Sequence, residues 1–176
     1  SAPRRETAAL AFTAHSIPMT MAALSRYEAQ LRTSAALVAE RVGMPDWALV
    51  FQSRSGRPED PWLEPDICDY LRTEGATGLP AAVICPIGFV CDHIEVLWDL
   101  DVEAAAVCRD LGIEMARAEA ANAEPAFIDM IADVVLRTVR RAEHGRLLPL
   151  VAMPQPAGSA PPAAAPGGRP GRPASS

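Results

Sequence analysis

AAVICPIGFVCDHIEVLWDLDVEAAAVCRDLGIEMA, residues 81–116, spans a strand, a helix and a second strand. The apolar segment Ala81–Cys85 lies between two prolines and predicts a buried strand. Asp92–Leu111 predicts a long helix that stops at Gly112, a residue type common just after helix ends. Ile113–Ala116 predicts the next short strand. This order is typical of two parallel strands joined by a right-handed crossover.

The same alternation continues on both sides of this unit. Two more strands are predicted, at Ala8–Thr13 and Trp47–Phe51. Three more helices are predicted, at Met21–Val42, at Glu64–Thr73 with Pro65 in its first turn, and at Ala126–Glu143, which closes the fold. Four strand–helix alternations predict an α/β fold. We expect one doubly wound unit, a four-stranded parallel sheet with helices on both faces.

The composition divides the chain into two regions. Hydrophobic residues make up 49% of the 176 residues, which is enough for a core. We expect the folded domain to cover residues 1–146. Residues 147–176 are mostly Pro, Ala, Gly and Ser and cannot bury enough apolar surface to fold, so we expect a disordered tail.

The charge balance excludes several classes of protein. All 16 basic residues are Arg, and 22 acidic residues bring the net charge to −6. A chain with this acidic net charge lacks the basic surface that is typical of nucleic-acid-binding proteins and peripheral membrane proteins. No apolar run reaches the roughly 18 residues that span a bilayer. Because the chain begins with Ser1 and not Met, we expect it to be part of a longer cytoplasmic protein.

The cysteines give no sign of a structural metal site. Cys68, Cys85, Cys91 and Cys108 are irregularly spaced and include no C-x-x-C pair. Since nothing here indicates secretion, we expect free thiols, most of them buried. Likewise, no G-x-G-x-x-G or G-x-x-x-x-G-K-[ST] loop follows a predicted strand, so a nucleotide-binding domain is poorly supported.

Ligands of open parallel sheets bind beyond the carboxyl ends of the strands. His15 follows the first predicted strand, Gln52–Arg54 follow the second and Pro86–Glu95 follow the third. His15 and His93 therefore fall on one edge of the sheet. An imidazole at this place is either a metal ligand or general base, or a side chain that is hydrogen-bonded in a turn. The sequence leaves both readings of His15 open.

The helix after the third strand carries an acidic ladder. Glu95, Asp99 and Glu103 are four residues apart, and no Lys or Arg lies between Asp92 and Glu103. Like charges at this spacing destabilise a helix, so the ladder indicates either a path for a hard divalent cation or a solvated acidic face. Asp92 and Glu95 also have the spacing of an N-terminal capping box.

Trp62 stands among polar and turn residues after the loop Ser53–Pro61. A tryptophan there either covers the core or offers a flat apolar face to a planar ligand.

Three motifs together resemble the carboxyl-terminal half of the ferrochelatases, most closely the actinobacterial coproporphyrin type. They are TAHSIP (13–18), FQSRSG (51–56) with DPWLEPD (60–66), and CPIGFVCDHIEVLWDLD (85–101). NAEPAFIDMIADVVL (122–136) resembles the closing helix of that family. The resemblance extends over residues 8–141.

The resemblance implies insertion of ferrous iron into a porphyrin, giving haem or coprohaem. It implies that His15 and Glu95 face each other across the metal, His15 as proton acceptor or ligand and Glu95 as opposing ligand. It further implies that Asp99 and Glu103 line a metal path, that Ser53 and Trp62 border the porphyrin pocket, and that the site helix contains a π-type turn.

The implied partners are a porphyrin, ferrous iron as substrate, and the amino-terminal half of the enzyme, which this chain lacks. No permanently bound cofactor is implied. Since no cysteine follows Cys108, we expect no iron–sulfur cluster. Two alternatives stay open: a chelatase for another metal such as cobalt or nickel, and a non-catalytic metal- or porphyrin-binding fragment.

Overall fold

The computed structural model describes residues 7–57 and 59–143, which contain one parallel sheet. Its strands are β1 (Ala8–His15), β2 (Trp47–Gln52), β3 (Ala81–Cys85) and β4 (Glu114–Arg117), in the spatial order β2–β1–β3–β4. All neighbouring pairs are parallel. The predicted α/β fold is confirmed. The predicted tail, residues 147–176, lies outside the described residues.

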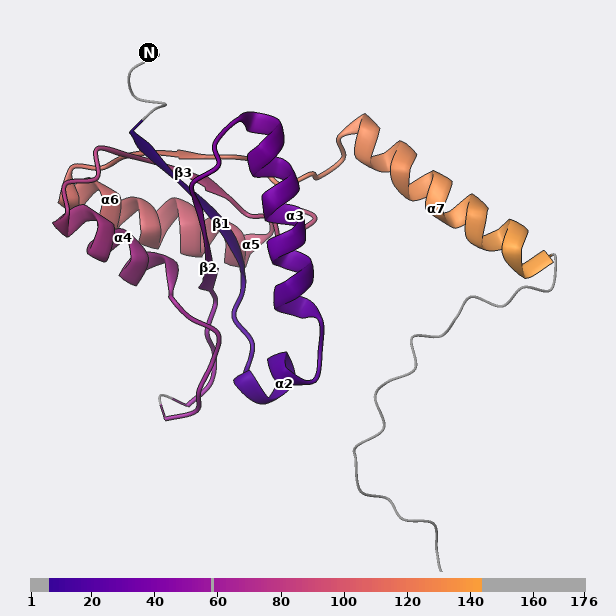
Figure 1. The fold of residues 1–176 in the computed structure, drawn as a ribbon, viewed down its shortest axis with the longest axis horizontal. Coiled ribbons are helices and arrows are strands. Elements are labelled where there is room, and N and C mark those ends of the chain that lie inside the picture. The colour runs from indigo at the N-terminus through magenta and orange to yellow at the C-terminus, as the bar shows by residue number, and fades with distance from the viewer. Residues whose placement is uncertain (1–6, 58, 144–176) are drawn as a thin grey trace, which may run out of the picture.

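Helices pack against both faces of the sheet (Figure 1). One face carries α4 (Ile67–Ala76) and the continuous helical run of α5 (Ile94–Val96), η1 (Leu97–Ala104) and α6 (Ala105–Leu111). The other face carries α3 (Tyr27–Val42). Parallel sheets are normally covered in this way, because both faces of their strands are apolar.

The α3 face shows how sequence spacing sets the packing. Leu31, Ala35 and Ala39 lie at i, i+4 and i+8, so they form one stripe, and all three are buried. They pack in one cluster with residues of β1 and β2, including Phe12 and Phe51. The helix ends as predicted, at a glycine in the left-handed region.

Two helix predictions need correction. The predicted helix Met21–Val42 is two helices, α2 (Met19–Ala23) and α3, because Ser25 lies between them and its hydroxyl bonds to backbone groups on both sides. The predicted helix Glu64–Thr73 is α4, which begins after Pro65. Its N-cap is Asp66, whose carboxylate accepts the backbone N–H of Cys68 at 2.8 Å.

The last described helix, α7 (Pro125–Glu143), forms where predicted but does not close the fold. None of its residues is buried, and it extends away from the sheet (Figure 1). Its apolar side chains, from Ile128 to Val139, are exposed. Within the described part of the chain, no helix is both long enough and apolar enough to cross a membrane.

Candidate functional site

The carboxyl edge of the sheet holds His15 in a fixed backbone position. The Tyr27 hydroxyl donates to the His15 carbonyl at 3.0 Å, and the backbone N–H of Ser16 donates to the carbonyl of Gln52 at 2.8 Å. The Ser16 hydroxyl donates to the carbonyl of Leu63 at 2.8 Å. The end of β1 is thus tied to α3, to β2 and to the segment before α4. Burial raises the pKa of Tyr27, which keeps this donor protonated.

The ring of His15 has a defined tautomer. Its Nδ1 lies 2.5 Å from the carbonyl oxygen of Ser16, and a carbonyl only accepts, so Nδ1 carries the hydrogen. In the neutral ring the lone pair is then on Nε2. This Nε2 lies 3.4 Å from Oε1 of Glu95, and both side chains are about half-exposed. An imidazole lone pair and a carboxylate therefore face each other at the carboxyl edge of the sheet.

The His15–Glu95 pair can hold a proton or a metal cation between its two facing atoms. Two acceptors attract each other only when a proton or a cation lies between them. With metal–ligand bonds of ~2.1 Å, a nitrogen and an oxygen on one cation at a near-tetrahedral angle are ~3.4 Å apart, which matches the observed separation. The pair supplies two ligands, and among the described residues no group of three or more His, Cys, Asp or Glu side chains is arranged to hold a metal.

The helix that carries Glu95 differs from the prediction at its start. Its N-cap is His93 and not Asp92: the Nδ1 of His93 accepts the backbone N–H of Val96 at 3.5 Å. The ring of His93 also contacts Phe89 edge-on. His93 therefore points into its own helix start. The π-type turn implied by the resemblance is present, as the π-helix η1.

The acidic ladder connects the helix to different parts of the site edge. Glu95 faces β1, through His15. Asp99 faces the end of β2: its Oδ2 accepts hydrogen bonds from the Ser53 hydroxyl and, at 3.2 Å, from the Gln52 amide. Ser53 is held in the left-handed region (φ 62°), an uncommon conformation for a residue with a side chain.

Glu103 and Trp62 lie further out. Glu103 is exposed, and its charge acts on the Cys68 thiol of α4, whose pKa rises to about 11 mainly because the thiol is buried. Trp62 is half-buried and lies against Gly56 of its own loop, where an added Cβ would come within 2.3 Å of the indole nitrogen. That nitrogen is buried without a hydrogen-bond partner among the described residues. The structure thus pairs His15 with Glu95 and Ser53 with Asp99 along one helix, and it holds Trp62 within its loop.

Sequence reasoning missed an ion-pair cluster beside the site. Arg117, the last residue of β4, bonds to Asp101 of η1 at 2.6 Å and 3.0 Å and to Asp92 at 2.9 Å. Asp92 also accepts from the Asn122 side chain and the backbone N–H of Ala120. Burial opposes ionisation of Asp92, but these donors outweigh it and lower its pKa. The cluster anchors η1 and the loop that contains Asp92. In the sequence, the only sign of this cluster is that Arg117 follows a strand that ends at the same sheet edge.

The four cysteines are free, as predicted. Cys108 is buried, Cys68 and Cys85 are half-buried, and burial raises the pKa of each of these three thiols. Only Cys108 is fully buried, so the expectation that most of the thiols are buried is not met. Cys91 is exposed because it lies in the loop that leads to the site helix.

Comparisons with known proteins agree on one family. The profile of the ferrochelatase family matches residues 1–139. A ferrochelatase of Rhodopirellula baltica is 58% identical over 125 residues, which are 70% of this chain and 36% of the relative. A coproporphyrin III ferrochelatase of Mycolicibacterium vanbaalenii is 48% identical over 134 residues, 74% of this chain and 40% of the relative. The chain thus spans less than half the length of these curated relatives.

A solved structure assigned to cobalamin (vitamin B12) biosynthesis, the CbiX protein of Marinobacter aquaeolei VT8, aligns with a TM-score of 0.48 at 16% identity. The alignment covers 76% of this chain and 98% of that one. The family profile extends over well more than half of the sequence, including every strand and the site helix. The chain belongs to the ferrochelatase family.

Proposed function

We propose that this chain forms the metal- and proton-handling side of a ferrochelatase active site, which inserts Fe²⁺ into a porphyrin. The observation that carries the proposal is the pair of His15 Nε2 and Glu95 Oε1, 3.4 Å apart at the ligand-binding edge of the sheet. Family membership gives the reaction class, and the pair gives it a chemical basis in this chain.

The reaction has two requirements that these residues fit. The porphyrin must lose two pyrrole protons, and Fe²⁺ must exchange water for the four ring nitrogens. His15 accepts a proton at Nε2, the atom left with a lone pair by the Nδ1 hydrogen bond. Glu95 supplies an anionic oxygen ligand to the incoming cation. The hydrogen bonds that hold the His15 backbone keep the two groups in register.

Asp99 and Ser53 have supporting roles in this proposal. Asp99 lies about one helical turn beyond Glu95, and hydrogen bonds from Gln52 and Ser53 to its Oδ2 orient the carboxylate. Its Oδ1 is then available to a cation that moves toward Glu95. Glu103 extends the same line outward to solvent. Ser53 and Trp62 are the proposed contacts to the porphyrin rim.

We propose coproporphyrin III as the porphyrin. Several relatives at 43–50% identity are coproporphyrin III ferrochelatases, including those of Mycobacterium avium and Nocardia farcinica. Fe²⁺ is a passing substrate here, and we propose no resident cofactor and no iron–sulfur cluster. The rest of the porphyrin pocket comes from the part of the enzyme that this chain does not span.

Anaerobic metalation tests the proposal. The chain, alone and supplied with the amino-terminal half of the Rhodopirellula baltica relative, is mixed with Fe²⁺ and coproporphyrin III or protoporphyrin, and the loss of free-porphyrin fluorescence is followed. We expect His15→Ala and Glu95→Gln to slow metalation by roughly 10²-fold or more, the range of a lost general base. His93→Asn is the matched control, because it removes the neighbouring histidine of the same edge but keeps a residue type suited to the N-cap of the site helix, and it should keep most of the activity.

The outcomes separate the parts of the proposal. Turnover near normal in His15→Ala, within a completed enzyme that is active, would remove His15 from the mechanism. Activity only in the completed enzyme would show that this chain is one wall of a two-part site. Faster metalation of protoporphyrin than of coproporphyrin III would overturn the substrate assignment and leave the reaction class intact.

A further inference from the structure

The site helix is attached to the sheet from two sides. Asp99 and Asp101 of η1 are separated by Leu100, which is fully buried in the core. Side chains two positions apart on a helix do not face each other but project to different sides. Asp99 is hydrogen-bonded at the end of β2, and Asp101 is paired with Arg117 at the end of β4. Because β2 and β4 are the two edge strands, the two attachments lie at opposite edges of the sheet.

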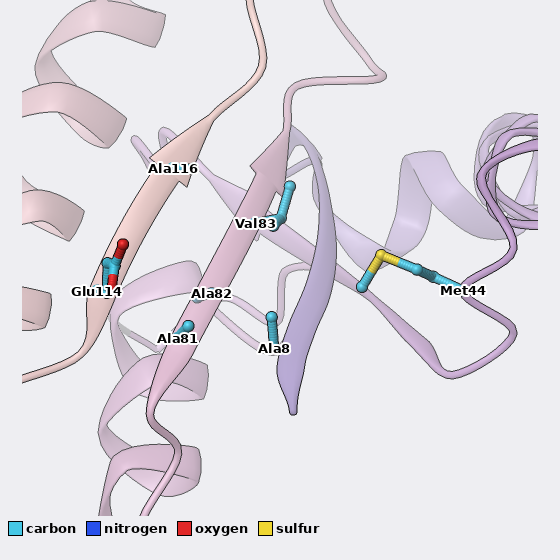
Figure 2. Close-up of a pocket in the computed structure, with 7 residues that line it drawn as sticks. All are labelled: Ala8, Met44, Ala81, Ala82, Val83, Glu114 and Ala116. Atoms are coloured by element: carbon cyan, nitrogen blue, oxygen red, sulfur yellow. The ribbon is translucent and has the colours of Figure 1, made fainter. Parts of the chain in front are cut away.

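The pleat of β4 directs Arg117 toward the face of the sheet that carries η1. Figure 2 shows Glu114 and Ala116 of β4 in a shallow pocket of ≈180 Å³ that Met44 reaches from the segment after α3. This pocket lies on the α3 face. Since successive side chains of a strand alternate between the two faces, Met115 and Arg117 point to the other face. Met115 packs against the core there, and the Arg117 side chain is only 13% exposed.

Arg117 makes a bidentate contact with Asp101. Its Nε and Nη2 donate to the two carboxylate oxygens, at 2.6 Å and 3.0 Å. Its Nη1 donates at 2.9 Å to Asp92, in the loop before the helix. A guanidinium and a carboxylate that meet through two parallel hydrogen bonds fix each other's orientation as well as their distance. Arg117 therefore limits the rotation of η1 about its own axis, which a charge alone would not do.

The π-helical conformation of η1 makes this support important. Turns of this kind are rare and occur mostly singly, often at functional sites, whereas η1 extends over eight residues. Burial of Leu100 and Ala104 fixes its inner side. The hydrogen bonds of Asp99 and of Asp101 fix the two flanks. If Arg117 were lost, η1 could rotate about its buried side, and Asp99 would move relative to its donors on β2.

We propose that Arg117 is a positioning residue for the metal-handling step, because it holds Asp101 and thereby keeps Asp99 directed at the site edge. The inference rests on the proposed function, in which Asp99 offers an oxygen to Fe²⁺ on its way to Glu95. The described hydrogen bonds of Arg117 go to the helix, to the loop before it and to the backbone after β4. Arg117 thus acts on the metal path through η1.

The start of the helix, which carries Glu95, has anchors other than Arg117. Asp92 also accepts hydrogen bonds from the Asn122 side chain and from the backbone N–H of Ala120. Glu95 itself lies in α5, before the π-helical part. Loss of Arg117 should therefore disturb η1 more than α5, and it should weaken the use of Fe²⁺ more than proton transfer.

A first test observes η1 directly in the 176-residue chain. Trp98 lies on η1 next to Asp99 and is 55% exposed, so its indole reports on this part of the helix. The chain is labelled with fluorotryptophan, and Trp98→Phe assigns the signal in fluorine NMR. We expect Arg117→Met to shift or broaden the Trp98 signal and to leave that of Trp47, on β2, unchanged, which also shows that the core is folded.

Arg32→Met is the matched control for this measurement. It removes an arginine that pairs with Glu28 at 2.7 Å on α3, on the other face of the sheet, and it should leave the Trp98 signal as in the parent chain. An unchanged Trp98 signal in Arg117→Met would overturn the proposal, whatever the activity of the enzyme.

Kinetics of the completed enzyme test the consequence for iron. Arg117→Met should raise the KM for Fe²⁺ about tenfold or more, the usual effect of losing a residue that orients a metal ligand, with much smaller changes in kcat and in the KM for the porphyrin. Arg117→Lys keeps the charge but not the planar fork, so its KM for Fe²⁺ should lie between the two. In an Asp99→Asn background, Arg117→Met should add nothing further, because both substitutions act on one carboxylate.

The outcomes separate this inference from the proposed function. If Asp99→Asn leaves the KM for Fe²⁺ unchanged in an active enzyme, the metal path is wrong, and the role of Arg117 is wrong with it. If Asp99→Asn raises this KM and Arg117→Met does not, only the positioning role is wrong. Effects that multiply in the double variant would also overturn it, since Arg117 would then act independently of Asp99.

Discussion

At the end of β1, one hydrogen bond determines which nitrogen of His15 keeps a lone pair and can accept a proton or bind a metal ion. Because the Ser16 carbonyl takes the Nδ1 hydrogen, Nε2 is the atom that faces Glu95. The sequence predicted both residues from their places at the sheet edge and from the resemblance. It could not predict the tautomer, because that depends on the direction of a single carbonyl in the turn.

Gly88 controls how closely the loop after β3 approaches His15. Its N–H donates to the Thr13 carbonyl at 3.0 Å, and a Cβ at Gly88 would lie 2.5 Å from the Cβ of Ala14 and 2.8 Å from its Cα. Backbone atoms of a buried strand cannot move aside. We expect Gly88→Ala to lower the free energy of unfolding by about 1–3 kcal/mol, the usual cost of overpacking. Urea denaturation measures it.

Gly75→Ala is the control for this prediction. Its added Cβ would meet the tip of Leu111, at 2.9 Å, and a flexible exposed side chain can shift. Alanine is also preferred over glycine inside a helix by about 1 kcal/mol. We therefore expect Gly75→Ala to be neutral or stabilising. Equal effects of the two substitutions would mean that the loop does not rest on β1 as described.

At the scale of elements, the strand positions followed from local sequence, whereas the capping residue of the site helix did not. Both ends of all four strands were predicted to within two residues. Short apolar runs between turn residues fit few secondary structures other than a buried strand. The start of the site helix was misplaced, because Asp92 has the residue type and spacing of an N-cap. In the fold its carboxylate is taken by Arg117 and Asn122, and His93 becomes the cap. Competition from residues 25 to 30 positions away is invisible to a local pattern.

The Asp92 cluster makes the anchoring of the site helix dependent on pH. Folding lowers the pKa of Asp92 below its ordinary value of 3.8, so the unfolded chain binds this proton first as pH falls. The stabilisation is thus fully present above that value and is lost as pH falls through the lower pKa of the folded state. We expect the free energy of unfolding to fall more steeply between about pH 5 and pH 2 in the parent chain than in Asp92→Asn.

Denaturation at a series of pH values measures this slope. Asp110→Asn, at an exposed aspartate of α6, is the control with the same change in charge. It should keep the slope of the parent chain. If Asp92→Asn kept that slope as well, the cluster would not be formed in solution.

At the scale of the whole molecule, the core is complete without α7. Both core clusters consist of residues between Leu10 and Ile113, and α7 buries none of its own. The sequence predicted the position of this helix correctly, but not that it stays apart from the core. It could not predict that the apolar side chains of α7 stay exposed among the described residues, because the periodicity of a helix shows which face is apolar and not what the face touches.

A chain that ends at Glu124 therefore tests the arrangement of the whole molecule. It keeps the linker bonds of Asn122 and loses all of α7. Its free energy of unfolding, measured by urea denaturation, should lie within about 0.5 kcal/mol of that of the full chain, as for changes remote from the core. A loss of about 2 kcal/mol or more in the shortened chain, the range of a lost core contact, would contradict this arrangement and place α7 on its own sheet.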